Sequence, residues 1–162
     1  MAKTKQQKVE ILEKIKDAIA NAASVVFVNF HGLGVSEANN MRNALKEEGI
    51  RYFVSKKTLI RRALEDAKLP GDIPVLDGEL AIAWGDDSIA PARGINTFAT
   101  KYEGKLSILG GIFERRLIGK EEMLAIASIP PLKTLYGQFV NIINSPIQGF
   151  VMALGQIAEQ KS

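Results

Sequence analysis

Apolar residues in the first 129 positions alternate between short continuous runs and helical spacing. The segment 24–30 is rich in β-branched and aromatic residues, which is typical of a buried strand. Between Val9 and Ile19, apolar residues recur at intervals of three and four, which predicts an amphipathic helix. The same two patterns predict further strands at 50–54, 80–84 and 105–113, and helices at 4–22, at 36–48 with Ser36 as cap and Gly49 at the end, at 56–67 with Ser55 as cap, at 90–102 and at 120–128.

The alternation of strands and helices indicates the fold class. The strands are few and short, so we expect an α+β fold with a ferredoxin-like small sheet covered by helices, rather than a large doubly wound sheet. Gly110 and Gly111 predict a β-bulge in the last strand. The segment Ile129-Pro130-Pro131 predicts a domain boundary because two prolines stiffen the backbone and stop a helix. We therefore expect one domain at 1–129 and a second at 130–162.

The segment after this boundary has an unusual pattern, because no charged residue occurs between Thr134 and Ala158. Phe139-Val140 recurs eleven residues later as Phe150-Val151. Eleven helical residues make about three turns plus roughly 20°, so the two pairs face nearly the same way, about 16 Å apart. Two copies of one apolar anchor on a long C-terminal helix indicate two copies of one partner. The apolar stripe comprises Leu132, Leu135, Tyr136, Phe139, Ile143, Ile147, Phe150, Leu154 and Ile157, and it is widened by Val140, Ile142, Val151 and Met152.

Other interpretations of this stripe are open. It is long enough to cross a membrane, although polar residues and Pro146 interrupt it. It is also compatible with a helix docked on its own domain, but one small domain would leave much of about 40 Å of helix uncovered. The main alternative is a peripheral membrane protein with an interfacial helix, which lacks the Lys and Arg that such helices favour. Pro146 predicts a kink, or a restart of the helix with Ser145 as cap.

Charge is distributed unevenly, although the formal net charge is only +3. Five basic residues and no acid lie between positions 51 and 62, and five acids and no base lie between 72 and 87. Lys56 and Lys57 open a predicted helix, where free backbone N–H groups help lysines to hold a phosphate. Tyr52 precedes them on a strand and has a ring that is able to stack on a base. A solvated basic helix face competes with nucleic-acid binding as the interpretation of Arg51, Lys56, Lys57, Arg61 and Arg62.

Residue types that carry catalysis or bind metals are scarce. The chain has one histidine, His31, and no cysteine, so it has no Cys–His pair, thiolate metal site or disulfide. Gly32-Leu-Gly34 is similar to the start of a dinucleotide loop, but Glu37 occupies the third glycine position, where its carboxylate would repel a pyrophosphate. We expect no enzyme activity, cofactor, metal or small-molecule substrate. The chain starts without an apolar run behind its lysines, so we expect no signal peptide and a cytoplasmic location.

Several segments, taken in order, resemble a known family. They are 25–35, Met41-Arg42 with Leu45, 54–64, Pro91-Ala-Arg93, Gly110-Gly111, Ile129-Pro130 and the two Phe-Val pairs. Their order across essentially the whole chain resembles the bacterial large-subunit ribosomal stalk-base protein, the L-ten family (universal uL-ten). The family usually has Arg at the position of His31 and Asn at that of Lys57.

The resemblance implies a structural role in the large subunit of the cytoplasmic ribosome. The N-terminal domain would bind large-subunit ribosomal RNA at the GTPase-associated region, beside the L-eleven protein. The C-terminal helix would bind about two dimers of the L-seven/L-twelve stalk protein, which recruit GTP-bound translation factors. The RNA role would fall to Gly32, Arg51, Lys56, Lys57, Thr58, Arg61 and Arg62, where Arg51 is added from the charge pattern. The stalk protein would contact Leu135, Tyr136, Phe139, Val140, Ile143, Ile147, Phe150, Val151 and Leu154.

Overall fold

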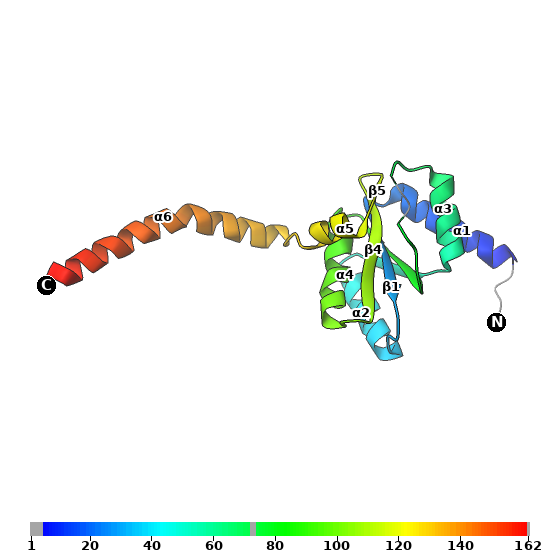
Figure 1. Cartoon of the computed structure of the whole chain (residues 1–162), viewed down its shortest axis with the longest axis horizontal. Helices are drawn as coiled ribbons and strands as arrows, with labels where there is room; N and C mark the ends of the chain where they lie inside the picture. Colours follow the sequence, from blue (N-terminus) through cyan, green and yellow to red (C-terminus); the bar gives the residue numbers. More distant parts are fainter. Residues whose placement is uncertain (1–4, 72–73, 162) are drawn as a thin grey trace. The chain divides into compact units, whose positions relative to one another are not determined.

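A computed structural model describes residues 5–71 and 74–161 (Figure 1). Two positions used above, Thr4 at the start of the first expected helix and Asp72 of the acidic run, lie outside the described residues. The chain divides into two units, residues 1–129 and residues 130–162.

The first unit is built on one sheet. Its strands are β1 (Ser24–Phe30), β2 (Arg51–Val54), β3 (Leu80–Gly85), β4 (Leu106–Phe113) and β5 (Arg116–Ile118). Among the described residues they form a five-stranded sheet in the order β2-β3-β1-β4-β5, with every neighbouring pair antiparallel. The first four strands have the order and directions of a ferredoxin-like sheet. The expected α+β class is confirmed.

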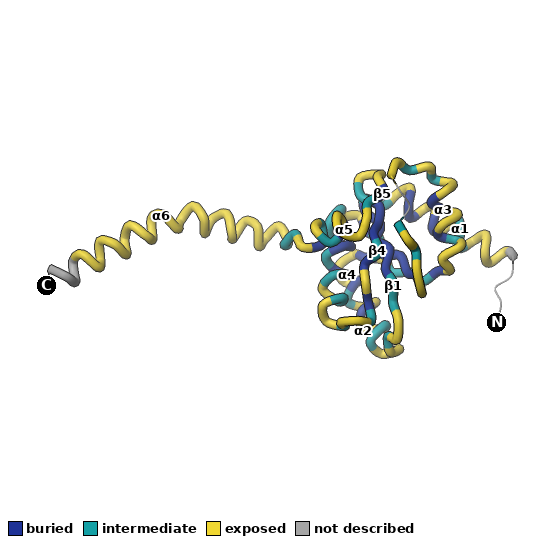
Figure 2. Tube along the Cα trace, in the orientation of Figure 1, coloured by how far each residue is buried: buried dark blue, intermediate teal, exposed yellow. Residues whose placement is uncertain are grey.

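Helices cover both faces of this sheet. Helices α1 (Lys5–Asn21) and α3 (Lys57–Ala67) supply Ile15, Ile19, Ile60 and Leu64 to the apolar cluster on one face. Helices α2 (Val35–Glu47), α4 (Ala90–Lys101) and α5 (Lys120–Ala127) supply Met41, Leu45, Ile95 and Met123 to the cluster on the other. The run from Val25 to Val28 in β1 is fully buried for this reason (Figure 2).

Strand β4 contains the expected bulge. Phe27 lies opposite Gly110 and Val28 lies opposite Ile108, so Leu109 is the extra residue. The bulge reverses the alternation of the strand, because Ile108 joins one apolar cluster and Ile112 joins the other. Gly111 is required by packing, since a Cβ atom there would lie 2.3 Å from the carbonyl oxygen of Val25.

Three local expectations were wrong. Helix α2 starts one residue before Ser36, with Gly34 in the capping position, because the Glu37 carboxylate accepts the Gly34 N–H bond. The N-cap position of α3 is occupied by Lys56 rather than Ser55, and Ser55 is buried. The third error concerns strand β5, which follows a turn in which Glu114 and Arg115 have positive φ, and which the sequence pattern did not predict.

The described part of the second unit forms one helix, α6 (Leu132–Lys161). It is continuous through Pro146, so the helix does not restart at Ser145. Figure 1 shows that it curves rather than running straight. All described side chains of this helix are exposed (Figure 2).

Candidate functional site

One end of the sheet collects several of the predicted RNA-binding residues. Strands β1 and β2 are both antiparallel to β3, so they run in the same direction and end at the same edge of the sheet. Gly32 follows β1, and Lys56 and Lys57 follow β2. The topology therefore places the loop that holds Gly32 and the start of α3 at one end of the sheet.

The start of α3 has the features of an anion site. Lys56 occupies the N-cap position and its side chain makes no capping hydrogen bond. The N–H groups of Leu59 and Ile60 donate to the Lys56 carbonyl oxygen, so those of Lys57 and Thr58 precede the first helical bond. Lys56, Lys57 and Thr58 are all exposed. Free N–H groups, the positive end of the helix dipole and two lysines together favour a bound phosphate.

Acidic side chains adjoin this basic surface. Arg61 and Arg62 are exposed on the next turn, but Arg61 forms a 3.1 Å ion pair with Glu65. Asp77 lies in a hollow of about 440 Å³ that is also lined by Lys57, Thr58 and Arg61. Residues 51–62 include no acid in sequence, but the fold brings Glu65 and Asp77 beside them. Glu65 lies beyond Arg61 along α3, and Asp77 shares the hollow with Lys57 and Thr58, whereas Lys56 is not part of its lining.

Asp66 is also near the basic surface. Its pKa lies below the usual range because the Lys16 ammonium donates a hydrogen bond to it, with weaker help from the nearby charge of Arg62. The Lys16 to Asp66 distance is 2.8 Å, and both side chains are nearly half exposed. This pair links α1 to α3.

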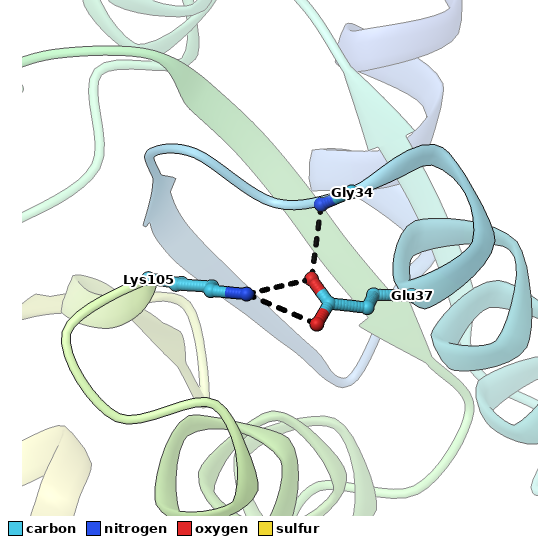
Figure 3. Close-up of polar contacts among 3 residues, drawn as sticks. All are labelled: Gly34, Glu37 and Lys105. Atoms are coloured by element: carbon cyan, nitrogen blue, oxygen red, sulfur yellow. Dashed lines mark hydrogen bonds and ion pairs between the residues drawn. The ribbon is translucent and has the colours of Figure 1, made fainter.

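The loop that holds Gly32 is fixed by a carboxylate (Figure 3). One oxygen of Glu37 accepts a hydrogen bond from the Gly34 N–H at 2.9 Å, and both of its oxygens accept from the Lys105 ammonium at 3.0 Å. The pKa of Glu37 is lowered, mainly by the Gly34 N–H bond and then by Lys105. Gly32 has φ +64 with open space around it, so backbone here is accessible to a close ligand.

Arg51 lies apart from the other predicted RNA-binding residues. It opens β2, so the length of the strand separates it from Lys56 and Lys57. Its neighbour Tyr52 is less available for stacking than the sequence suggests, because the Arg42 guanidinium lies 5.8 Å from the centre of its ring. Burial raises the pKa of Tyr52 to about 12, with Arg42 acting in the opposite direction.

Helix α6 presents a second surface, which is apolar. Phe139 and Phe150 are 62% and 66% exposed, and their neighbours Val140 and Val151 are exposed to a similar degree. Because the helix is continuous, the two Phe-Val pairs keep the expected offset of about three turns. The other predicted contact residues, Leu135, Tyr136, Ile143, Ile147 and Leu154, are exposed as well.

Comparisons with known proteins decide the family. Residues 3–100 match the family model described as ribosomal protein L10. The chain is 36% identical over 162 residues to the large ribosomal subunit protein uL10 of Shouchella clausii, which covers 99% of this chain and 97% of that protein. The uL10 proteins of Staphylococcus carnosus and Bacillus cereus are each 34% identical, and they cover 96% and 99% of this chain and 94% and 97% of their own lengths.

The chain belongs to the ribosomal protein L10 family. It is therefore a structural protein of the large ribosomal subunit in the cytoplasm and not an enzyme, as expected from the sequence. The family model extends from α1 into α4 and so includes every predicted RNA-binding residue. The uL10 relatives extend over α6 as well.

Metal sites and membrane spans are two further kinds of feature that a structure can reveal. Among the described residues, no group of three or more His, Cys, Asp or Glu side chains is placed to hold a metal ion. In the same part of the chain, the apolar length needed to cross a membrane is not reached by any helix.

Proposed function

We propose that the first unit binds large-subunit ribosomal RNA at the GTPase-associated region, beside the L-eleven protein, through the end of the sheet that carries Gly32 and the start of α3. The observation that carries the proposal is the exposed, uncapped N-terminus of α3 flanked by Lys56 and Lys57. Backbone N–H groups and lysines bind phosphate without reading sequence, so this surface positions the RNA backbone. Membership of a ribosomal family supports RNA as the polyanion.

The surrounding charges indicate how the RNA approaches. Glu65 and Asp77 would repel phosphates placed along the side of α3, and Arg61 is engaged by Glu65. A phosphate at the start of α3 lies about two turns from Glu65, and the free N–H groups with Lys56 and Lys57 offset the nearby carboxylate of Asp77. The RNA backbone therefore crosses the end of the sheet, and Arg61 and Arg62 contribute mainly through long-range attraction.

The test is a salt titration of binding to a ribosomal RNA fragment from the GTPase-associated region. Changing Lys56, Lys57, Arg61 and Arg62 to Ala should weaken binding. It should also flatten the slope of log K against log salt by roughly 0.7–0.9 for each phosphate that the variant no longer neutralises. A matched control changes four exposed bases elsewhere, Lys8, Lys101, Arg116 and Lys120, to Ala. Equal effects of the two variants, or no effect of the first, would reject this surface.

We also propose that α6 binds two dimers of the L-seven/L-twelve stalk protein, one at each Phe-Val pair, and that these dimers recruit GTP-bound translation factors. The exposure of both pairs on one helix supports this, since a large exposed apolar surface marks an interaction site. Burial of apolar side chains contributes about 25 cal/mol per Å² before the costs of association.

Native mass spectrometry of the full chain with the stalk protein tests the number of sites. Changing Phe150 and Val151 to Ala should remove one dimer and leave RNA binding intact. The matched control changes Asn141 and Gln148, which lie about 180–200° from Phe139 around the helix, to Ala. A bound number other than two dimers would contradict the repeat, and retention of both dimers by the Phe150 and Val151 variant would contradict the second site.

A further inference from the structure

Strand β2 lies at one edge of the sheet. Among the described residues it pairs with β3 on one side only, and it is the terminal strand in the order β2-β3-β1-β4-β5. The Ser55 N–H donates to the Leu80 carbonyl oxygen, and Phe53 lies opposite Ile82. Because hydrogen-bonded and non-bonded pairs alternate in an antiparallel ladder, the N–H and C=O groups of Tyr52 and Val54 point away from β3. The edge therefore offers two donors and two acceptors to a further strand.

A groove of about 860 Å³ runs along this edge, between α1 and α2. Successive residues of β2 point to opposite faces, so Phe53 lies on the α1 side and Tyr52 on the α2 side. The α1 side combines apolar and polar residues: Ala18 and Ala22 face the same groove as Phe53 and Trp84, and Lys14, Asp17 and Asn21 also line it.

The α2 side of the groove is basic. Arg42 and Lys46 line it, and no acidic residue of α2 does so. Lys14 and Arg51 add positive charge and Asp17 and Asp86 add negative charge, which leaves an excess of two positive charges over the whole lining. Within the described part of the chain, none of these four bases forms an ion pair.

We propose that this groove binds an extended acidic segment of a partner protein, which adds a strand antiparallel or parallel to β2. Alternate residues of the segment face the two walls, so apolar side chains contact the α1 side and carboxylates contact Arg42 and Lys46. The alternating donors and acceptors of Tyr52 and Val54 match the spacing of a polypeptide backbone, which carries one N–H and one C=O group per residue, better than an RNA backbone, whose phosphates only accept. The function is separate from RNA binding, because the groove is lined by Arg51, Tyr52 and Phe53 of β2 and its lining does not include Lys56 or Lys57.

The test uses the full chain and a fluorescent octapeptide of alternating valine and glutamate. We expect anisotropy to report binding, and NMR to show protection of the Tyr52 and Val54 amide protons. A peptide with lysine in place of glutamate should bind about tenfold or more weakly, because like charges then face Arg42 and Lys46. Two further peptides carry N-methyl groups on the odd-numbered or on the even-numbered residues. One of them should lose binding and the other should keep it, because only alternate N–H groups of the peptide face β2.

Variants locate the site on the protein. Arg42→Glu with Lys46→Glu should weaken peptide binding about tenfold or more. The matched charge reversal on the opposite edge, Arg116→Glu with Lys120→Glu, should leave it unchanged. Circular dichroism checks that both variants are folded. If one variant is unfolded, the N-methylated peptides still test the proposal on the unaltered protein.

Three outcomes would overturn the proposal. The first is a peptide affinity weaker than about 1 mM for the unaltered protein. The second is protection of Tyr52 and Val54 by an eight-nucleotide polyuridine RNA but not by the peptide. The third is sedimentation showing a dimer whose formation protects the same two amides, because the occupant of the edge is then a second copy of the chain.

Discussion

Helices α1 and α6 both carry an apolar stripe at helical spacing, but only α1 packs its stripe against its own unit. Ile15 of α1 is 1% exposed, whereas Ile143 of α6 is 57% exposed. The stripe on α1 is narrow and is bordered by charged residues, as in a helix packed on one sheet. The stripe on α6 is wide and has polar but uncharged neighbours. The comparison shows that periodicity predicts the helix, while the width of the stripe and the lack of charge indicate a partner outside the unit.

The largest expected difference comes from truncating matched isoleucines. Ile15→Ala should lower the free energy of unfolding by about 2–5 kcal/mol, because it leaves a cavity between α1 and the sheet. Ile143→Ala should change it by less than about 0.5 kcal/mol, because the side chain is exposed. Chemical denaturation followed by circular dichroism measures both. A loss above about 2 kcal/mol for Ile143→Ala would mean that this side chain is packed in the isolated protein.

Replacing Pro146 should affect α6 alone. Proline removes one helical hydrogen bond and is about 3 kcal/mol less favourable than alanine inside a helix. Pro146→Ala should therefore raise the helicity of the chain and leave the unfolding midpoint of the first unit unchanged. Far-ultraviolet circular dichroism reports the first quantity, and the near-ultraviolet signal of Trp84 reports the second. A shifted midpoint would show that the two units are energetically coupled.

Matched glycines should respond in opposite directions. Gly111→Ala should destabilise the first unit by about 1–3 kcal/mol, because the new methyl group meets the Val25 carbonyl oxygen and the Met123 side chain. Gly149→Ala should stabilise α6 by up to about 1 kcal/mol, because nothing lies within 4 Å of the added atom. Thermal melts compare the two. A stabilised Gly111→Ala protein would contradict the packing described for β4.

The smallest effect concerns pH. The pKa of Glu37 is lowered from 4.5, so its ionised form stabilises the fold above about pH 4.5. That stabilisation is lost as the pH falls through the lower pKa of the folded state. Glu37→Gln should therefore lower the melting temperature at pH 7 and have a smaller effect near pH 3. Helicity of α6 should not follow this pH dependence, since residues 134–158 carry no carboxylate.

Most of the fold follows from patterns in the sequence, and the exceptions have physical causes. Strand β5 has three residues and follows a turn without glycine or asparagine, so neither its length nor its turn indicated it. Ser36 and Ser55 are good capping residues, but Glu37, held by Lys105, binds the N–H group of Gly34 and places the N-cap of α2 two residues before Ser36, and Ser55 is buried.

The sequence indicates the residue types of the proposed RNA-binding surface but not how they are arranged in space. Lys56 and Lys57 were identified from an acid-free run, while Asp77 approaches Lys57 through the fold and not through the sequence. Glu65 stands four residues after Arg61, and this spacing on a helix is sufficient to predict the ion pair between them. Arg51 joins the basic run in sequence, but the length of β2 separates it from the start of α3. Strand topology, which periodicity does not fix, decides each of these points.

The strand order also has a consequence for synthesis of the chain. β1 is made first, yet both of its partners, β3 and β4, lie at least fifty residues later. The apolar run of β1 therefore stays unpaired until residues 80–113 have been synthesised. Formation of the sheet thus depends on contacts between residues that are distant in sequence. During translation, β1 is an aggregation-prone segment until β4 emerges. α6 follows last, so its exposed apolar stripe emerges only after every strand of the sheet has been synthesised.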